Sequence, residues 1–209
     1  MVEILYEDEN ILVINKPYGL DSQKEVPELL HKQLGYDILP IHRLDKTVTG
    51  LIVYGKNSYA VNEITKQIQN KQFHKEYLAV TSQLPPKQSD TLIDLLFHDR
   101  QKNKTYVVKR ERKGVKKAIL SYTLLDKSEN KALLLIKPET GRTHQIRIQL
   151  ANIKLPLVGD GKYGSKENCH CALFAYHLSF NNPKDNSIID LRIKPNHYPF
   201  NLFNLEKIL

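Results

Sequence analysis

Short β-type runs recur along this sequence, and their arrangement limits the possible folds more than any other feature. The runs are expected at residues 3–6, 11–15, 50–54, 74–81, 91–97, 118–125, 132–136, 172–180 and 188–193. Helices are expected in only three places, near residues 27–33, from 57 or 58 to about 70, and from about 143 to 152. Because strands and helices do not alternate regularly, the pattern predicts an α+β fold. Its sheet is mixed and largely antiparallel, with helices and loops beside it.

The two longer helices carry apolar stripes that predict packing on a sheet. In the first, Asn57 or Ser58 is a suitable N-cap, because its side-chain oxygen can accept from a free amide of the first turn. The buried stripe of that helix is expected to contain Val61, Ile64 and Ile68. The buried stripe of the second is expected to contain Ile146, Leu150 and Ile153.

Length and charge indicate one folded domain with an anionic partner. The chain has 209 residues, 41% of them hydrophobic, and 31 Lys and Arg against 23 Asp and Glu give a net charge of +8. A positive excess of this size favours nucleic acid as the partner. A basic surface that only keeps the protein soluble would give the same net charge. No apolar run reaches the roughly 18 residues of a membrane span, and the N-terminus is acidic. With only two cysteines, a reducing cytoplasm is expected.

Much of the positive charge lies in residues 102–117, where Glu111 is the only acidic residue. Such a stretch is typical either of a disordered linker or of an exposed basic surface. The run Tyr106-Val107-Val108 inside it favours a basic hairpin.

A first polar motif, His42-Arg43-Leu44-Asp45, precedes the run at 50–54. A carboxylate at the edge of a sheet beside basic groups is well suited to act as a nucleophile or base, because the cations keep it ionised. A surface Arg–Asp pair is an equally good interpretation of these residues alone.

A second motif, residues 140–147, leads into a predicted helix whose first turns carry Arg142, His144 and Arg147. Free amide groups and two guanidinium groups would form a site for a phosphate or for a partner carboxylate. A solvated helix start is the alternative.

Two further motifs have weaker functional interpretations. Residues 159–164 match a dinucleotide fingerprint in form, but no apolar helix follows, so a tight glycine-dependent turn is favoured. Cys169-His170-Cys171 has no second cluster that would complete a zinc site, and no bound metal is expected.

Taken in order, five motifs resemble the RluA family of pseudouridine synthases. They are residues 15–20 (Asn-Lys-Pro-Tyr-Gly-Leu), 42–45 with Gly50, 75–79 (Lys-Glu-Tyr-Leu-Ala), 141–147 (Gly-Arg-Thr-His-Gln-Ile-Arg), and Gly159-Asp160 with Tyr163-Gly164. The resemblance extends from the first strand to about residue 195. It implies a single pseudouridine synthase catalytic domain over residues 1–209, with the fold of that family and no separate N-terminal RNA-binding domain.

The resemblance also implies a reaction and roles for particular residues. Uridine in structured RNA, ribosomal or transfer RNA, would be isomerised to pseudouridine without a cofactor, after the base is flipped out of the RNA. Asp45 matches the catalytic aspartate, Tyr77 the active-site tyrosine, and Arg147 a basic residue that pairs with the aspartate. The residues expected to bind RNA are His42, Arg43, Arg142, His144, Lys109, Arg110, Arg112 and Lys113.

The chain departs from the family pattern at three places. Val48-Thr49 replaces the usual Thr-Ser, Asp21-Ser22-Gln23 stands where a His is frequent, and Gln149 also replaces a frequent His. We therefore expect the choice of target to differ from that of the relatives. We also expect a monomeric, cytoplasmic enzyme that acts on RNA and has no DNA or membrane partner. A non-catalytic RNA-binding or chaperone domain is the alternative. A glycoside hydrolase would need a second acid near Asp45, and no neighbouring motif offers one.

Overall fold

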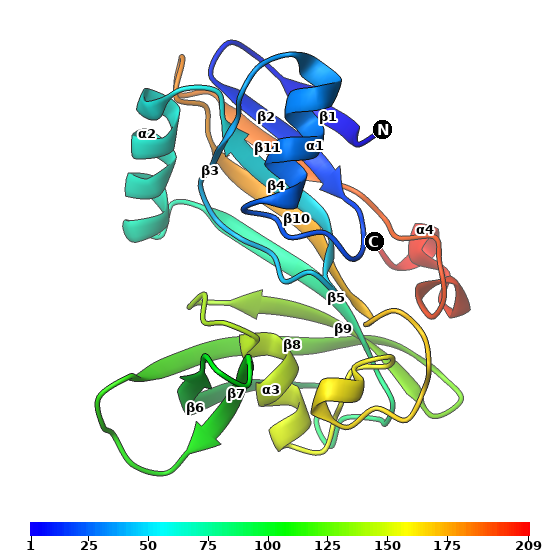
Figure 1. Ribbon diagram of the computed structural model, residues 1–209. Helices are drawn as coiled ribbons and strands as arrows, with labels where there is room; N and C mark the ends of the chain where they lie inside the picture. Colours follow the sequence, from blue (N-terminus) through cyan, green and yellow to red (C-terminus); the bar gives the residue numbers. More distant parts are fainter. The chain divides into compact units, whose positions relative to one another are not determined.

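The computed structural model describes residues 1–209, and the contacts divide the chain into two units. The first unit comprises Met1–Glu76 and Phe174–Lys194, and the second comprises Tyr77–Leu173 and Pro195–Leu209. The chain passes between the units three times, within strand β5 (His74–Thr81), at the start of strand β10 (Leu173–Asn181) and between Lys194 and Pro195; Figure 1 shows both strands. Each unit is described by itself below.

The first unit is built on strands β1, β2, β4 and β10, which lie side by side in that order. Strand β4 pairs with β10 in parallel, while β1 with β2 and β2 with β4 are antiparallel. Short strand β3 also pairs with β4, and β11 pairs with β10, both antiparallel. Besides β10, the elements of this unit are β1 (Glu3–Glu7), β2 (Ile11–Lys16), α1 (Glu25–Leu34), β3 (Leu39–Pro40), β4 (Thr49–Gly55), α2 (Ser58–Gln69) and β11 (Ile188–Arg192).

The core of the first unit lies between the central strands and helix α2. Strands β2 and β4 are buried along nearly their whole length, as expected for central strands. Ala60 and Ile64 of α2 are fully buried against them. The other buried members of this core are Ile11, Val13, Leu51, Val53, Phe73, Leu178, Phe180 and Ile189.

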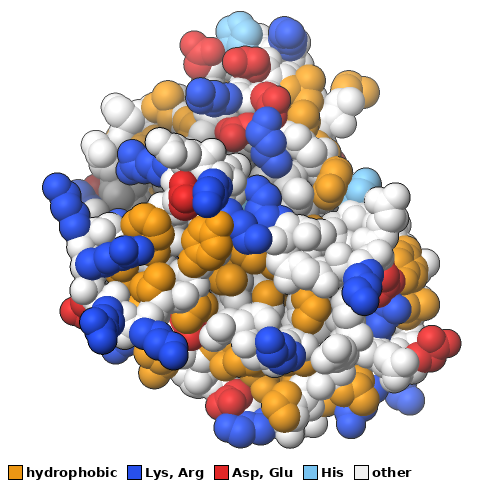
Figure 2. All heavy atoms as spheres, turned by 60° about the horizontal axis from the view of Figure 1, so that its bottom comes forward, with side chains coloured by type: hydrophobic (Ala, Val, Ile, Leu, Met, Phe, Trp, Pro, Cys, Tyr) orange, Lys and Arg blue, Asp and Glu red, His pale blue; other side chains and the backbone are white.

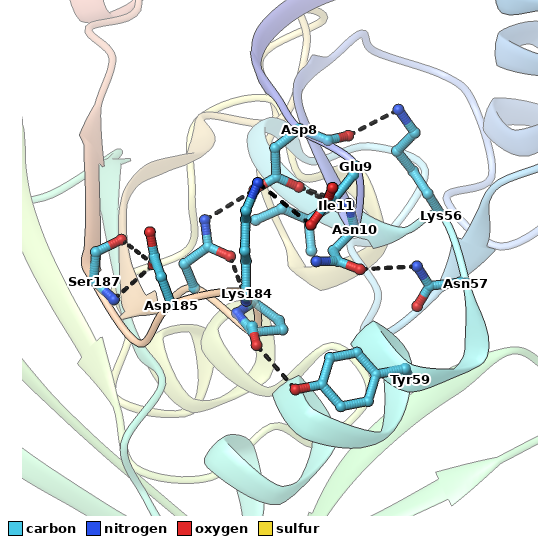
Figure 3. A network of polar contacts seen from close by, with 12 residues as sticks. Asp8, Glu9, Asn10, Ile11, Lys56, Asn57, Tyr59, Lys184, Asp185 and Ser187 are labelled. Atoms are coloured by element: carbon cyan, nitrogen blue, oxygen red, sulfur yellow. Dashed lines mark hydrogen bonds and ion pairs between the residues drawn. The ribbon is translucent and has the colours of Figure 1, made fainter.

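Polar contacts join the loops at one end of the first unit (Figure 3). The Asp8 carboxylate accepts hydrogen bonds from the amides of Asn10 (2.7 Å) and Ile11 (2.9 Å), which closes the turn between β1 and β2. It also accepts from the Tyr6 hydroxyl (3.0 Å) and from Asn182 Nδ2 (2.8 Å). Asp8 therefore connects this turn to the turn between β10 and β11.

The second unit is an antiparallel sheet in the order β5, β9, β8, β6, β7. Helix α3 and a single turn of 3₁₀-helix, η1, belong to this unit (Figure 1). Its other elements are β6 (Ser89–Asp99), β7 (Lys104–Val108), β8 (Val115–Ser128), β9 (Lys131–Pro138), α3 (Gln145–Asn152), η1 (Gly161–Tyr163), η2 (Phe200–Leu202) and α4 (Leu205–Ile208).

The predicted α+β class, with a mixed and mostly antiparallel sheet, is confirmed. The Asn57 side chain caps α2 as expected, because it accepts from the Ala60 amide at 2.9 Å. Strand β5 has the predicted bounds. That residues 1–209 form one catalytic domain stays a prediction.

Three local predictions need correction. Helix α1 begins at Glu25, two residues before the expected start, and Pro27 lies in its first turn, a position that suits a proline. Helix α3 begins at Gln145, because His144 has a left-handed backbone (φ 56°) that cannot belong to the helix. The basic stretch 102–117 is not a hairpin of its own: β7 and β8 pair with opposite edges of β6.

None of the helices combines the length and the apolar character that spanning a bilayer requires. Cys169 and Cys171 are free thiols, and burial raises the pKa of Cys169. No group of three or more His, Cys, Asp or Glu side chains is arranged to hold a metal ion.

Gly50, at the start of β4, gives the first testable prediction. Its φ is +106°, and an added Cβ would overlap the backbone oxygen of Ala175 in β10. We expect Gly50→Ala to lower the free energy of unfolding by about 3 kcal/mol, measured by urea denaturation. The control is Gly141→Ala, where no heavy atom lies within 4 Å of the new Cβ. Equal stability of the two variants would contradict the close approach of β4 and β10.

Candidate active site and RNA-binding residues

Asp45 lies in the loop between β3 and β4 and is half-buried. Its backbone oxygen accepts from the Val48 amide (3.0 Å), which forms a tight turn just before β4. On either side of it, Leu44 is buried and Lys46 is exposed. The loop is therefore anchored at Leu44 and enters the sheet immediately after the turn.

Ser22 holds the Leu44 side of this loop. The Ser22 hydroxyl is buried, donates to the backbone oxygen of Leu44 (2.9 Å) and accepts from the Leu44 amide (3.1 Å). The backbone oxygen of Ser22 in turn accepts from the hydroxyl of buried Tyr54 (2.7 Å). One short side chain thus satisfies both backbone groups of the residue before Asp45 and connects them to β4.

Lys16 holds the other side of the loop. Its side chain has no exposed surface, and its ammonium group donates to the backbone oxygens of Pro17 (2.8 Å), Leu20 (2.9 Å) and Lys46 (3.4 Å). Gly19 adds a backbone bond from its amide to the Lys46 oxygen (2.8 Å). The residue after Asp45 is therefore tied to the segment 16–20.

The ammonium group also brings a positive charge to the neighbourhood of Asp45. Burial lowers the pKa of Lys16 to about 8, and the negative charges of Asp45, Asp21 and Glu25 act against this shift. At neutral pH Lys16 is therefore mostly protonated. A carboxylate in the field of a buried ammonium group can serve as a nucleophile or a base.

Residues 42 and 43 differ in their surroundings. Arg43 is exposed. The His42 ring packs edge-on against Phe73, with ring centroids 5.4 Å apart, and its Nε2 accepts a long hydrogen bond from the Val53 amide (3.4 Å). Burial, and then the charge of Lys75, hold the pKa of His42 well below its usual value. His42 is thus neutral at pH 7, and its role in binding RNA stays a prediction.

In the second unit, Tyr77 is buried at the start of the β5 segment that pairs with β9, where it lies opposite Ile136. Arg147 is buried in the first turn of α3. Its Nε donates to Asp160 Oδ2 (2.7 Å) and its Nη2 donates to Asp160 Oδ1 (2.8 Å). This two-point pairing fixes the plane of the guanidinium group.

The tyrosine of η1 completes this arrangement. The Tyr163 ring lies under the guanidinium group of Arg147, with 5.1 Å between the guanidinium carbon and the ring centroid. Its phenol oxygen accepts from the Thr105 amide (2.8 Å) and is hydrogen-bonded to His144 Nδ1 (2.8 Å). His144 is accordingly buried, and its role in binding RNA also stays a prediction.

At the start of α3, the structure shows the second of the two predicted alternatives, a partner carboxylate, because Arg147 binds Asp160. Gln145 Oε1 accepts from the Arg142 amide (3.0 Å) and from the Thr140 hydroxyl (2.8 Å), so the side chain of the first helical residue occupies part of this position. The Arg142 side chain is exposed, and its Nε donates to the backbone oxygen of Lys117 (3.1 Å). Arg142 is therefore available to solvent beside the basic strand β8.

The loop between β7 and β8, residues 109–114, carries the other predicted RNA contacts. Lys109, Arg110, Arg112 and Lys113 are all exposed there. The Arg112 guanidinium carbon lies 4.8 Å from the centroid of the Phe97 ring in β6. Figure 2 shows Lys and Arg side chains interspersed with exposed hydrophobic ones on the face turned forward. We call residues 109–114 the basic loop.

Comparison with known proteins assigns a family. The model of the RNA pseudouridylate synthase family matches residues 10–152. The chain belongs to the RNA pseudouridylate synthase family. The predicted resemblance to the RluA-type enzymes is thereby confirmed, and the family is one of RNA-modifying isomerases.

Relatives of known name differ in the RNA that they modify. A ribosomal large subunit pseudouridine synthase D from Borreliella burgdorferi is 31% identical over 78% of this chain and 55% of the relative. A tRNA pseudouridine synthase C from Vibrio cholerae is 29% identical over 86% of this chain and 80% of the relative. An RNA pseudouridine synthase from Haemophilus influenzae is 30% identical over 78% and 74%, respectively. This chain thus spans about half of the first of these relatives.

Solved structures support the fold. Human RNA pseudouridylate synthase domain containing 1 aligns with a TM-score of 0.81 and 20% identity, over 95% of this chain and 85% of that chain. Human RNA pseudouridylate synthase domain containing 4 aligns with a TM-score of 0.77 and 23% identity, over 96% and 90%. The pseudouridine synthase fold is therefore the fold of this chain.

Sequence reasoning missed the supporting residues Lys16, Ser22 and Asp160. Lys16 and Asp160 stand in motifs that carry the family resemblance, but their residue types alone indicated no chemistry. The signal that could have identified Lys16 is its position directly after the β-type run 11–15. A lysine at such a strand end can be buried only when hydrogen-bond acceptors satisfy its ammonium group.

The buried ammonium group of Lys16 predicts a distinctive pH dependence. In the unfolded chain Lys16 keeps its proton up to its ordinary pKa of 10.5, whereas the folded chain releases it near pH 8. The unfolded state therefore binds more protons in this window, and stability rises with pH. We expect the stability of the wild type relative to Lys16→Met to increase by about 2 kcal/mol from pH 7.5 to pH 9.5, measured by urea denaturation.

Exposed Lys24 provides the control for this experiment. The difference between the wild type and Lys24→Met should stay constant over the same pH range. A constant difference for Lys16→Met as well would show that the ammonium group is not buried as described.

Proposed function

We propose that this protein isomerises specific uridines to pseudouridine in structured RNA, ribosomal or transfer RNA, with Asp45 as the catalytic carboxylate. Membership of the family supports the reaction. The observation that carries the assignment of Asp45 is the support of its loop on both sides by buried Ser22 and Lys16. A carboxylate that must react at one atom of a bound base needs such a fixed backbone.

The reaction requires the C1′–N1 bond of uridine to break, the uracil to turn, and C5 to form a new bond to C1′. The proton on C5 is then lost and N1 carries a proton, so no external cofactor is needed. Asp45 serves either as a nucleophile that attacks C1′ or as a base that removes a proton from the ribose and leads through a glycal. Both routes need an ionised carboxylate.

The family pattern implies the roles of two residues in the second unit. Tyr77 stacks on the uracil and assists the transfer of the C5 proton. Arg147 is the basic partner that the family pattern gives to the reacting carboxylate. Both side chains are buried, as expected for groups that act on a base removed from solvent.

Binding of the RNA is assigned to the exposed basic residues. A uridine in folded RNA must be flipped out of its stack before any group can reach C1′. Arg43, two residues before Asp45 and exposed, is suited to hold the neighbouring phosphates or to enter the space that the base leaves. Arg142 and the basic loop provide further phosphate contacts, and the net charge of +8 agrees with an RNA partner. We further propose a monomer in the cytoplasm, with one catalytic domain over residues 1–209.

The first test of this function uses RNA labelled with tritium at C5 of uridine, isolated from cells that lack the gene. The wild type should release tritium, and Asp45→Asn should reduce the release at least about a thousandfold, because the amide can act neither as nucleophile nor as base. RNA affinity should change little. Asp37→Asn, which alters an exposed carboxylate of the same unit, is the control. Release by Asp45→Asn at the control rate would reject Asp45, and RNA binding without release by the wild type would favour a non-catalytic RNA-binding domain.

The basic loop gives a second test. Replacing Lys109, Arg110, Arg112 and Lys113 together by Glu should weaken RNA binding and reduce the slope of log K against log salt by about 1 for each phosphate that the loop no longer neutralises. Turnover at saturating RNA should not change. A control with Lys24→Glu and Lys32→Glu alters two exposed lysines of the first unit. A loss of turnover with unchanged affinity would mean that the basic loop is not a phosphate-binding surface.

A further inference from the structure

The motif Gly159-Asp160 with Tyr163-Gly164 has no role in the proposed reaction so far, yet it surrounds Arg147. The Arg147 and Asp160 side chains keep only 5% and 2% of their surface exposed. Both oxygens of the carboxylate accept from the guanidinium group, at 2.7 and 2.8 Å. A buried ion pair of this kind often contributes little net stability, because both charges lose their hydration. A role in geometry is therefore a reasonable explanation for it.

The backbone around Asp160 is fixed by several contacts. Its amide donates to the oxygen of Leu157 (3.1 Å), and its own oxygen accepts from the amides of Tyr163 (3.0 Å) and Ser165 (3.1 Å). The preceding Gly159 has φ +75°, and a Cβ there would overlap the backbone oxygen of His170. The backbone of Asp160 is thus held by its own turn, independently of Arg147.

Tyr163 fixes the guanidinium group from a second direction. Its ring faces the guanidinium group at 5.1 Å, while its phenol oxygen bonds to the Thr105 amide in β7 and to His144 at the start of α3. Burial raises the pKa of Tyr163, so the phenol stays protonated at neutral pH. Carboxylate and ring together restrict both the in-plane rotation and the tilt of Arg147.

A guanidinium group has five N–H bonds in one plane. Asp160 accepts hydrogen bonds from the N–H of Nε and from one N–H of Nη2. The same contact therefore fixes the directions of the other three N–H bonds. We propose that Asp160, supported by Tyr163, is a positioning residue that holds Arg147 in the one orientation that its role in the reaction requires. This rests on the proposed function, in which Arg147 assists catalysis.

The kinetic test compares Asp160→Asn with the wild type in the tritium-release assay. The amide keeps the shape of the side chain but removes its charge and one acceptor, so Arg147 can turn. We expect kcat to fall about 10- to 100-fold with KM for RNA nearly unchanged. Combined with Arg147→Lys, the same substitution should cause less than about a twofold further loss, because the two residues act as one unit.

The matched control is Asp94→Asn. Asp94 also contacts α3, through Gln149 Nε2 (2.8 Å), but lies outside the proposed catalytic groups. Its kcat should stay near that of the wild type, even where its stability falls. Equal losses of kcat in Asp160→Asn and Asp94→Asn would mean that Asp160 merely supports the helix. That outcome would overturn the proposal.

A measurement on the wild type needs a variant only to assign one signal. The chain has seven arginines, and the Nε–H signal of Arg147 in the NMR spectrum is assigned by its loss in Arg147→Lys. We expect a single sharp signal with slow hydrogen exchange, unlike that of exposed Arg43. Fast exchange of the Arg147 signal, or a normal kcat in Asp160→Asn, would overturn the proposal while the wild type remains active. Absence of tritium release from the wild type would instead overturn the proposed function, and the positioning role with it.

Discussion

The buried ammonium group of Lys16 is the interaction on which the Asp45 loop depends. Moving a lysine charge out of water is unfavourable, and only good hydrogen bonds offset the cost. Three backbone oxygens receive the charge, two from the segment that follows β2 and one from Lys46. The fold can therefore keep Lys16 inside only by bringing these two parts of the chain together. The same requirement puts a cation near Asp45.

The second unit also contains a buried cation, which is satisfied by a carboxylate rather than by backbone oxygens. Arg147 is buried on α3, and the turn at Asp160 brings a carboxylate to it. In both units, the candidate catalytic groups are supported by buried polar side chains with defined partners rather than by apolar packing alone. Such contacts are directional, so they fix an orientation as well as a position. This precision is what a reaction without a cofactor needs, because all of its chemistry falls to side chains.

The exposed charges serve a different purpose. Arg43, Arg142 and the basic loop keep their long side chains in water, where they lose little hydration and can adapt to a phosphate backbone. The buried cations help to orient the candidate catalytic groups, whereas the exposed cations are suited to attract the phosphates of RNA. The two histidines do not belong with the exposed cations: His144 is buried, His42 is half-buried, and their rings pack against Tyr163 and Phe73. A sequence pattern that groups all basic residues together cannot separate these two classes, because burial depends on contacts distant in the chain.

The sequence by itself determined the fold class, most of the elements, the family and the residues in its motifs. Helix α2 with its Asn57 cap and strand β5 followed from local patterns, since capping and alternation act over a few residues. Only the tertiary structure decided the pairing of β7 and β8 with opposite edges of β6, the left-handed backbone of His144, and the support of Asp45 and Arg147 by Ser22, Lys16 and Asp160. Most of these features join segments well separated in the chain, and their energies depend on burial and on hydrogen-bond partners that no local pattern specifies.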